Sequence, residues 1–158
     1  MVKEKYQAEA TRDDITAKAM LKNRPVSLKY STEICNRIKG IPVRKAERFL
    51  GNIILHKEFL PLVRYHKKVP HRKGQSVAGM KAGRYPENTC KAFLELISYA
   101  KANAENKGLD ADKLLVRHCF ACKGFRRFKM QPKGKIAGKR RKAKSAHLEI
   151  ILQEVASI

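Results

Sequence analysis

One run near the C-terminal end of the sequence limits most strongly what this chain can fold into. No acidic residue lies between Asp112 and Glu149, and thirteen lysines or arginines stand in that interval. The middle of the run, residues 124–143, is poor in large apolar side chains, which are Phe125, Phe128, Met130 and Ile136. These are too few to bury a core of their own. The run therefore predicts a basic arm that binds a polyanionic partner.

The residues that flank this arm alternate in the manner of β-strands. Residues 114–123 predict an ascending strand, with Leu114, Val116, His118, Phe120 and Cys122 on one face. Residues 146–155 predict a returning strand, which places Ala146, Leu148, Ile150 and Leu152 on one side. The basic run connects these two strands, so the sequence predicts one long β-hairpin over residues 114–155, with its tip at about residues 125–142.

The first half of the chain is dominated by helical periodicity. Residues 17–21 are expected to begin a strand, and Ser27 to cap a helix that Gly40 ends. A second helix is expected over residues 44–56. A third is expected over residues 88–107, capped by Asn88 and ended by Gly108. Their apolar stripes predict core positions. The stripes are Ala46, Phe49, Leu50, Ile53 and Ile54 in the second helix, and Ala92, Phe93, Leu96, Ile97, Ala100 and Ala104 in the third.

Between the second and third helices lies a segment rich in glycine and proline, residues 60–86. Residues 61–86 contain no acidic residue, and their lysines and arginines are interspersed with aromatic side chains. So long a loop is unusual in a compact domain unless it is functional, and this composition is typical of RNA contact. A merely solvated basic loop is the alternative. The predicted contact residues are Arg64, Tyr65, Lys67, Lys68, Arg72, Lys73, Lys81 and Arg84.

The charge of the whole chain supports the same class of partner. Thirty-six basic residues against fourteen acids give a net charge of +22, which favours association with nucleic acid. No stretch approaches the roughly 18 apolar residues of a membrane-spanning helix, and the N-terminus does not resemble a signal peptide, so a cytoplasmic protein is expected. Cys119 and Cys122 have the spacing of a zinc-binding pair, but no second pair exists and a strand would turn them to opposite faces. No metal or cofactor is therefore predicted.

Catalytic chemistry is not indicated, because the acids are few, the histidines lack a nucleophile partner and no phosphate-cradling glycine loop opens a helix. Two extended basic segments suit a large folded RNA better than a recognition helix suits a DNA groove. A free-standing RNA-binding or RNA-chaperone module and an architectural DNA-binding protein remain alternatives. On the arm, the predicted contacts are Lys123, Arg126, Arg127, Lys129, Lys133, Lys135, Lys139, Arg140, Arg141, Lys142 and Lys144.

Several short motifs, in this order and spacing, resemble a known family. They are Arg37-Ile38-Lys39-Gly40, Arg44-Lys45-Ala46, Phe49-Leu50, Gly83-Arg84-Tyr85-Pro86, residues 103–110, Pro132-Lys133-Gly134-Lys135 and Ser145-Ala146-His147-Leu148. The family is the universal large-subunit ribosomal protein numbered twenty-two in bacteria and archaea and seventeen in eukaryotic cytosolic ribosomes. The segment of residues 59–86 is similar to that of the archaeal and eukaryotic branch.

The resemblance implies an α+β fold: three helices packed on a small antiparallel sheet, with a long protruding β-hairpin. Residues 1–16 would be an N-terminal tail and residues 17–158 a single domain. It also implies a structural role in the large ribosomal subunit, binding its RNA, supporting assembly and lining the exit tunnel opposite ribosomal protein four. By position, the tip that faces the nascent polypeptide would be Met130, Gln131, Pro132, Lys133, Gly134, Lys135, Ile136, Ala137, Gly138 and Lys139.

Overall fold

The computed structural model describes residues 6–8, 13–74 and 79–155, and its centre is one antiparallel sheet. Three strands form it in the order β1-β7-β4: β1 (Thr16–Arg24), β7 (Ala146–Glu154) and β4 (Leu114–Lys123). The last strand in sequence is therefore the middle strand in space, and both neighbours run antiparallel to it. The strand expected to begin at residues 17–21 is confirmed, and it continues to Arg24.

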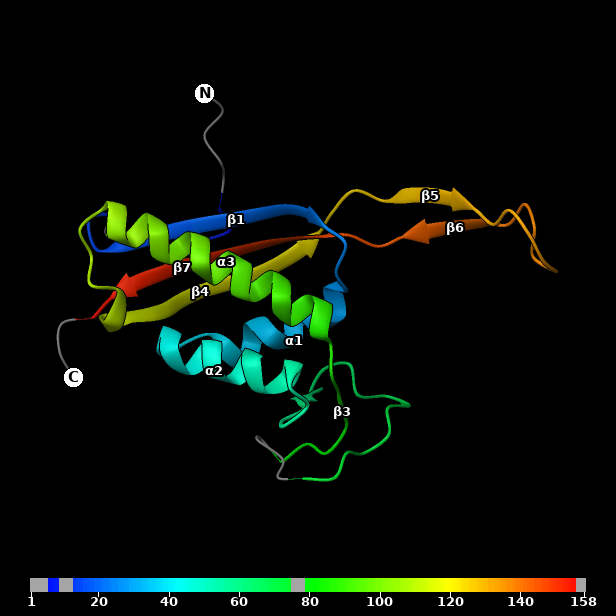
Figure 1. Ribbon diagram of the computed structural model, residues 1–158, viewed down its shortest axis with the longest axis horizontal. Helices are drawn as coiled ribbons and strands as arrows, with labels where there is room; N and C mark the ends of the chain where they lie inside the picture. The colour runs from blue at the N-terminus through cyan, green and yellow to red at the C-terminus, as the bar shows by residue number, and fades with distance from the viewer. Residues whose placement is uncertain (1–5, 9–12, 75–78, 156–158) are drawn as a thin grey trace.

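Helices cover one face of this sheet, as Figure 1 shows. Helix α3 (Glu87–Asn106) crosses β1 and β7, while α1 (Leu28–Ile38) packs on β4 and α2 (Val43–Ile54) packs against α3. A short 3-10 turn, η1 (Ala111–Lys113), leads from α3 into β4. The expected capping of α3 by Asn88 is wrong, because the helix begins at Glu87 directly after Pro86 and Asn88 lies inside it.

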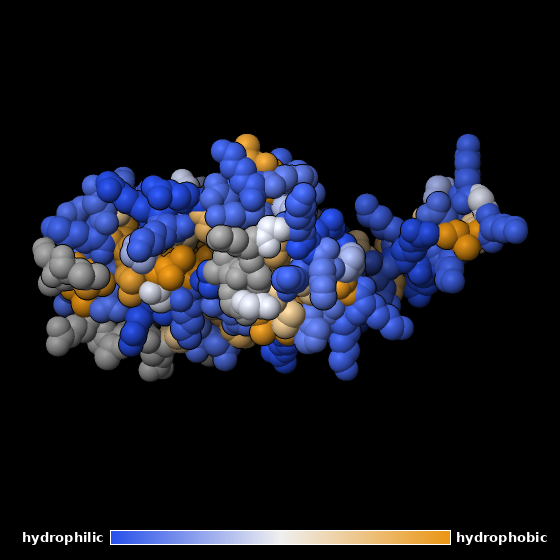
Figure 2. Space-filling model, turned by 90° about the horizontal axis from the view of Figure 1, so that it is seen from below, coloured by the Kyte–Doolittle hydropathy of each residue, from blue (hydrophilic) through white to orange (hydrophobic). Residues whose placement is uncertain are grey.

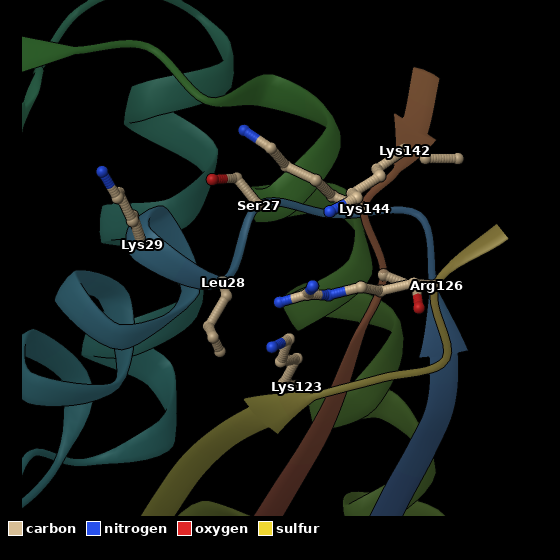
Figure 3. Close-up of a pocket in the computed structure, with 9 residues that line it drawn as sticks. Ser27, Leu28, Lys29, Lys123, Arg126, Lys142 and Lys144 are labelled. Carbon is tan, nitrogen blue, oxygen red and sulfur yellow. The ribbon is translucent and has the colours of Figure 1, made fainter. Parts of the chain in front are cut away.

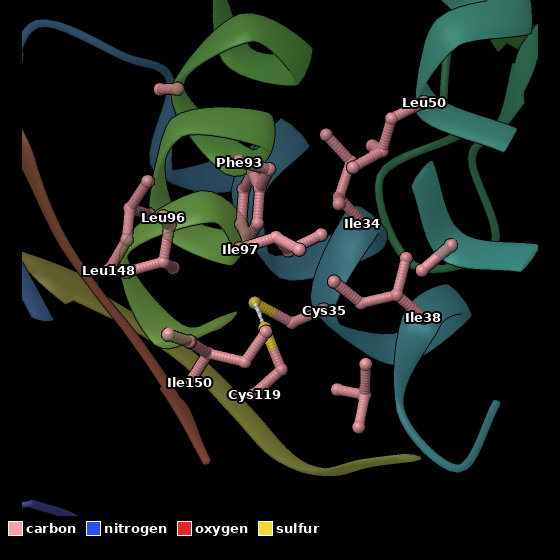
Figure 4. Close-up of a cluster of buried hydrophobic side chains, with 14 of the residues drawn as sticks. Ile34, Cys35, Ile38, Leu50, Phe93, Leu96, Ile97, Cys119, Leu148 and Ile150 are labelled. Carbon is pink, nitrogen blue, oxygen red and sulfur yellow. Dashed lines mark hydrogen bonds between the residues drawn. The ribbon is translucent and has the colours of Figure 1, made fainter. Parts of the chain in front are cut away.

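The core lies between the helices and the sheet and joins all of these elements. Phe93 and Ile97 of α3, Ile34 of α1, Leu50 of α2 and Leu148 of β7 are fully buried there (Figure 4). The predicted stripe of α3 is buried throughout. In α2, Ala46, Leu50 and Ile53 are buried, whereas Phe49 and Ile54 are partly buried at its edge. The α+β architecture expected for this chain is confirmed.

Strand β4 departs from the predicted alternation at one point. Its register shifts between Val116 and His118, so Arg117 is an extra residue opposite β7. Beyond this bulge Cys119 and Ala121 face the core, and Phe120 and Cys122 face outward. The prediction that His118, Phe120 and Cys122 share a face with Leu114 and Val116 is therefore wrong.

The bulge lies where a second segment joins the edge of β4. The connection between α1 and α2 runs beside the start of the strand: Val116 N donates to Ile41 O at 3.0 Å, and Gly40 N donates to Val116 O at 2.8 Å. Gly40 has a φ of +81°, as expected of the residue that ends α1. Within the described residues, no helix is long and apolar enough to cross a membrane.

Candidate nucleic-acid interface

The basic arm leaves the sheet where β4 ends, returns to it where β7 begins, and extends away from the rest of the protein (Figure 1). Its strands β5 (Arg127–Met130) and β6 (Arg140–Ala143) pair antiparallel, from Arg127 opposite Ala143 to Met130 opposite Arg140. Every residue of β5 is exposed, and so are the first three of β6. Figure 2 shows the arm as a largely hydrophilic projection with one apolar patch near its outer end.

The aromatic side chain in the middle of the arm is held by cations rather than by a core. Phe128 is 51% exposed, and the Arg140 guanidinium lies 4.6 Å from the centre of its ring. The Lys142 ammonium lies 5.9 Å from the same centre. These contacts orient two basic side chains across the ribbon.

The outer turn of the arm spans residues 131–139 and has its own hydrogen bonds. Gly138 N donates to Gln131 O at 2.9 Å, and Ala137 N donates to Gly134 O at 2.9 Å. Gly134 and Gly138 both have positive φ angles, of +89° and +76°, which glycine adopts without strain. Of the ten residues predicted for the tip, Met130 ends β5 and the other nine form this turn, which is exposed apart from the half-buried Gln131.

A narrow neck joins the arm to the sheet at residues 124–126 and 144–145. Gly124 N donates to Ser145 O at 3.0 Å, and Phe125 N donates to the side chain of Asn23, at the end of β1, at 2.8 Å. A Cβ atom on Gly124 would lie 2.6 Å from Ser145 Oγ and 2.9 Å from Asn23 Oδ1. The neck therefore requires glycine for close approach, and β1 fixes where the arm leaves the sheet.

The basic loop between α2 and α3 is closed by pairing within itself and is anchored to α1. Strands β2 (Leu60–Pro61) and β3 (Gly83–Arg84) pair antiparallel, and His71 bridges to Ala82. The buried carboxylate of Glu33 accepts hydrogen bonds from the backbone N–H groups of Arg64 and Tyr65, at 2.8 and 2.9 Å. Acceptance by a charged group makes these bonds stronger than neutral ones.

The aromatic rings of the loop also hold its cations. Lys29 and Arg64 lie 5.4 and 5.7 Å from the centre of the Tyr65 ring. Arg72 lies 5.5 Å from the Tyr85 ring and donates from Nε to Gly83 O at 3.3 Å. Among the predicted loop contacts, Arg64, Lys67, Lys68, Lys73 and Lys81 are exposed, and Tyr65, Arg72 and Arg84 are half-buried.

Two adjoining cavities lie where the neck, the start of α1 and the basic loop meet. The first, about 530 Å³, brings together four predicted contacts of the arm: Lys123, Arg126, Lys142 and Lys144. The second, about 690 Å³, is lined by Tyr65 and Lys67 of the loop. Ser27 and Lys29 line both cavities, as do Lys142 and Lys144. Sequence patterns did not single out Ser27 or Lys29 as contacts, because their position depends on how α1 packs against the hairpin.

The cysteines are placed as their spacing predicted. Cys119 is buried and Cys122 is exposed, so they face opposite sides of β4. The Cys119 thiol donates to Cys35 Sγ of α1 at 3.1 Å inside the core (Figure 4), and burial raises the pKa of Cys119 well above its usual value. Across the described residues, no group of three or more His, Cys, Asp or Glu side chains could hold a metal ion.

Fold and surface together define a small, strongly basic α+β protein with a protruding two-stranded arm. Residues 19–153 match the family of ribosomal protein L22p/L17e, and the chain belongs to this family. It is thus a ribosomal protein rather than an enzyme, as the sequence predicted.

Curated relatives agree over almost the whole length of the chain. The chain is 38% identical over 146 residues to "Large ribosomal subunit protein uL22" of Methanopyrus kandleri, covering 92% of this chain and 91% of that protein. The protein of the same name from Methanocaldococcus jannaschii is 37% identical over 154 residues, or 98% and 97% of the two chains. The protein from Haloquadratum walsbyi is 40% identical over 110 residues, or 70% and 68%. All three sources are archaeal, consistent with the archaeal and eukaryotic type of the family.

Proposed function

We propose that this protein is a structural component of the large ribosomal subunit that binds its RNA and supports its assembly. It then resides in the cytoplasm as part of that particle, among neighbouring ribosomal proteins. The proposal rests on family membership and on the names of the relatives, which are large-subunit proteins.

The observation that carries RNA binding is the absence of acidic residues along the projecting arm. The arm projects from the base, which is the sheet β1-β7-β4 with helices α1, α2 and α3. No acidic residue lies between Asp112 and Glu149 to neutralise the cations of the arm. Cations that project in this way can neutralise phosphates and release the counterions condensed on RNA. The basic loop adds a second surface of the same sign.

The tip of the arm supports a finer proposal, in which residues 130–139 line the polypeptide exit tunnel. The family resemblance motivates it, together with the reach of the arm beyond the base. In this arrangement the sides of the ribbon, with Arg126, Arg127, Lys129, Arg140, Arg141 and Lys142, contact RNA. The turn faces the nascent polypeptide, opposite ribosomal protein four.

Sedimentation tests the ribosomal role directly. The full-length protein is mixed with large subunits stripped of their own copy of this family member, and the mixture is centrifuged in moderate salt. Stoichiometric sedimentation with the subunits is expected. Failure to sediment, combined with binding to many unrelated RNAs, would favour the free-standing RNA-binding module, and preference for duplex DNA would favour the architectural protein.

Deletion of residues 131–139 tests the role of the tip. The base should remain folded and the variant should still enter the subunit, because the neck and the loop are untouched. The tunnel constriction should then be wider, as measured by electron microscopy of the reconstituted particle. Loss of incorporation would instead show that the tip is needed for docking.

A further inference from the structure

We propose that the two adjoining cavities at the neck form one groove, which holds the sugar-phosphate backbone of a single RNA strand between the arm and the base. This inference rests on the proposed RNA-binding function and deepens it. The groove is defined by the residues common to both cavities: Ser27, Lys29, Lys142 and Lys144. Those four residues line both cavities, which places the two side by side.

The charge of the groove selects a polyanion. Its walls carry the cations Lys29, Lys67, Lys123, Arg126, Lys142 and Lys144, and no acidic residue lines either cavity. None of the six forms an ion pair with a carboxylate in the part of the chain that the structure describes. Cations gathered without an acid repel one another, and an anion placed among them removes that repulsion.

The shape of the groove favours a strand over a single small anion. One end lies at the neck, where the side chains of Lys123 and Arg126 extend toward Leu28 at the start of α1 (Figure 3). The other end lies at the basic loop, where Tyr65 and Lys67 line the second cavity. A chain of linked phosphates can contact both ends at once, whereas one phosphate cannot.

The lining favours contact with the backbone rather than with the bases. The Tyr65 ring already has Lys29 and Arg64 against it, at 5.4 and 5.7 Å, so it orients cations instead of offering a free stacking face. Ser27 lines both cavities, and its hydroxyl can donate to a phosphate oxygen. Binding should therefore depend little on base sequence.

A strand in this groove would also join two parts of the molecule that are otherwise connected only by the neck. Lys29 belongs to the base, whereas Lys142 belongs to the arm and Arg126 to the neck between them. A phosphate chain contacting both sides would fix the direction of the arm relative to the base. The groove is thus a site for orienting the arm as well as for affinity.

Paired charge variants of the full-length protein test the groove, with fluorescein-labelled octauridylate as the probe. The groove variant is Lys29→Ala with Lys144→Ala. The control is Lys45→Ala with Lys91→Ala, which removes the same charge from exposed positions on α2 and α3. The groove variant should bind about ten-fold more weakly than the control. The slope of its log binding constant against log salt concentration should be smaller in magnitude than that of the control by about 1.4, or 0.7 per lost phosphate contact. Equal weakening of both variants would overturn the groove and leave only bulk attraction.

Three further measurements do not depend on the variants. Octaadenylate should bind as tightly as octauridylate, and an octaglutamate peptide should compete far less well. Effective competition by the peptide would overturn an RNA site in favour of an acidic protein partner. Reductive methylation read by mass spectrometry should show Lys29 and Lys144 protected by octauridylate while Lys45 and Lys91 are not. Unchanged labelling of Lys29 would overturn the proposal.

The sedimentation experiment distinguishes failure of the groove from failure of the ribosomal role. Wild-type protein that sediments with large subunits, while groove and control variants bind octauridylate equally, would refute the groove and keep the ribosomal role. Wild-type protein that does not sediment would refute the ribosomal role, whatever the oligonucleotide shows.

Discussion

The base and the arm of this protein carry aromatic side chains of the same type in opposite surroundings. Phe93 of α3 is fully buried among the side chains of three helices and the sheet. Phe128 of β5 is 51% exposed and contacts Arg140 and Lys142. The base is stabilised by excluding water from apolar surface, whereas the arm has no such interior. Stability and recognition are thus separated along the chain, and substitutions in each region should have different consequences.

Removing each phenyl ring in turn tests this separation of stability from recognition. Phe93→Ala should lower the free energy of unfolding by about 3–5 kcal/mol, because it leaves a cavity in the core. Phe128→Ala should change it by less than about 0.5 kcal/mol, since the site is a surface. Urea denaturation followed by circular dichroism measures both. Similar losses in the two variants would show that the arm contributes to folding.

A second prediction concerns the anchor of the basic loop. Glu33→Ala should destabilise the protein by about 2 kcal/mol, because two backbone N–H groups lose their charged acceptor. Glu58→Ala removes the same charge from an exposed position and should have little effect. Hydrogen exchange at Arg64 and Tyr65 should accelerate only in the Glu33 variant. Unchanged exchange there would mean that other contacts hold the loop.

The neck can be tested by adding one methyl group. Gly124→Ala should cost about 1 kcal/mol, because the new Cβ must displace Asn23 or Ser145. Gly51→Ala, in the middle of α2 with open space around it, should stabilise by up to about 1 kcal/mol through helix propensity. Thermal denaturation gives the sign of both changes. If Gly124→Ala is neutral, the neck is looser than its hydrogen bonds indicate.

The cysteines of the base should differ in reactivity without any change in stability. Burial raises the pKa of Cys90 to about 12 and raises that of Cys119, whereas Cys122 is exposed on the outer face of the sheet. Iodoacetamide should therefore alkylate Cys122 first. Partial burial also raises the pKa of Cys122, so its thiolate fraction should keep increasing above the ordinary thiol pKa of about 8.5. Peptide mass mapping of samples labelled between pH 7 and 10 follows the order, and earlier labelling of Cys35 or Cys119 would show that the base opens.

Elements with one buried face could be predicted from the sequence. The stripe of α3, the inward residues of β7 and the bounds of β4 follow from periodicity, because burial on one side imposes a repeat on the side chains. The arm could be predicted because the sequence between β4 and β7 lacks acidic residues and residues that could form a core. The exposed position of its cations follows from the same composition.

Features that depend on distant partners could not be predicted in this way. The bulge at Arg117 lies beside the segment of residues 40–42 that pairs with the edge of β4, and no local pattern encodes that pairing. No pattern in the sequence of α1 marks Glu33, yet its carboxylate accepts a hydrogen bond from the backbone of Arg64 in the basic loop. Lys29 likewise joins the groove only because α1 packs beside the hairpin.

The order of strands has a consequence for how the protein folds as it is synthesised. Strand β7 is the central strand, and it is the last strand to be made. Strands β1 and β4 have no backbone contact with each other in the sheet, so neither can pair within it until residues 146–154 have left the ribosome. Until then the apolar faces of α1 and α3 lack the surface that finally covers them, which makes the growing chain prone to aggregation. Folding of the base is therefore completed only after nearly the entire arm has been exposed to whatever polyanion is nearby.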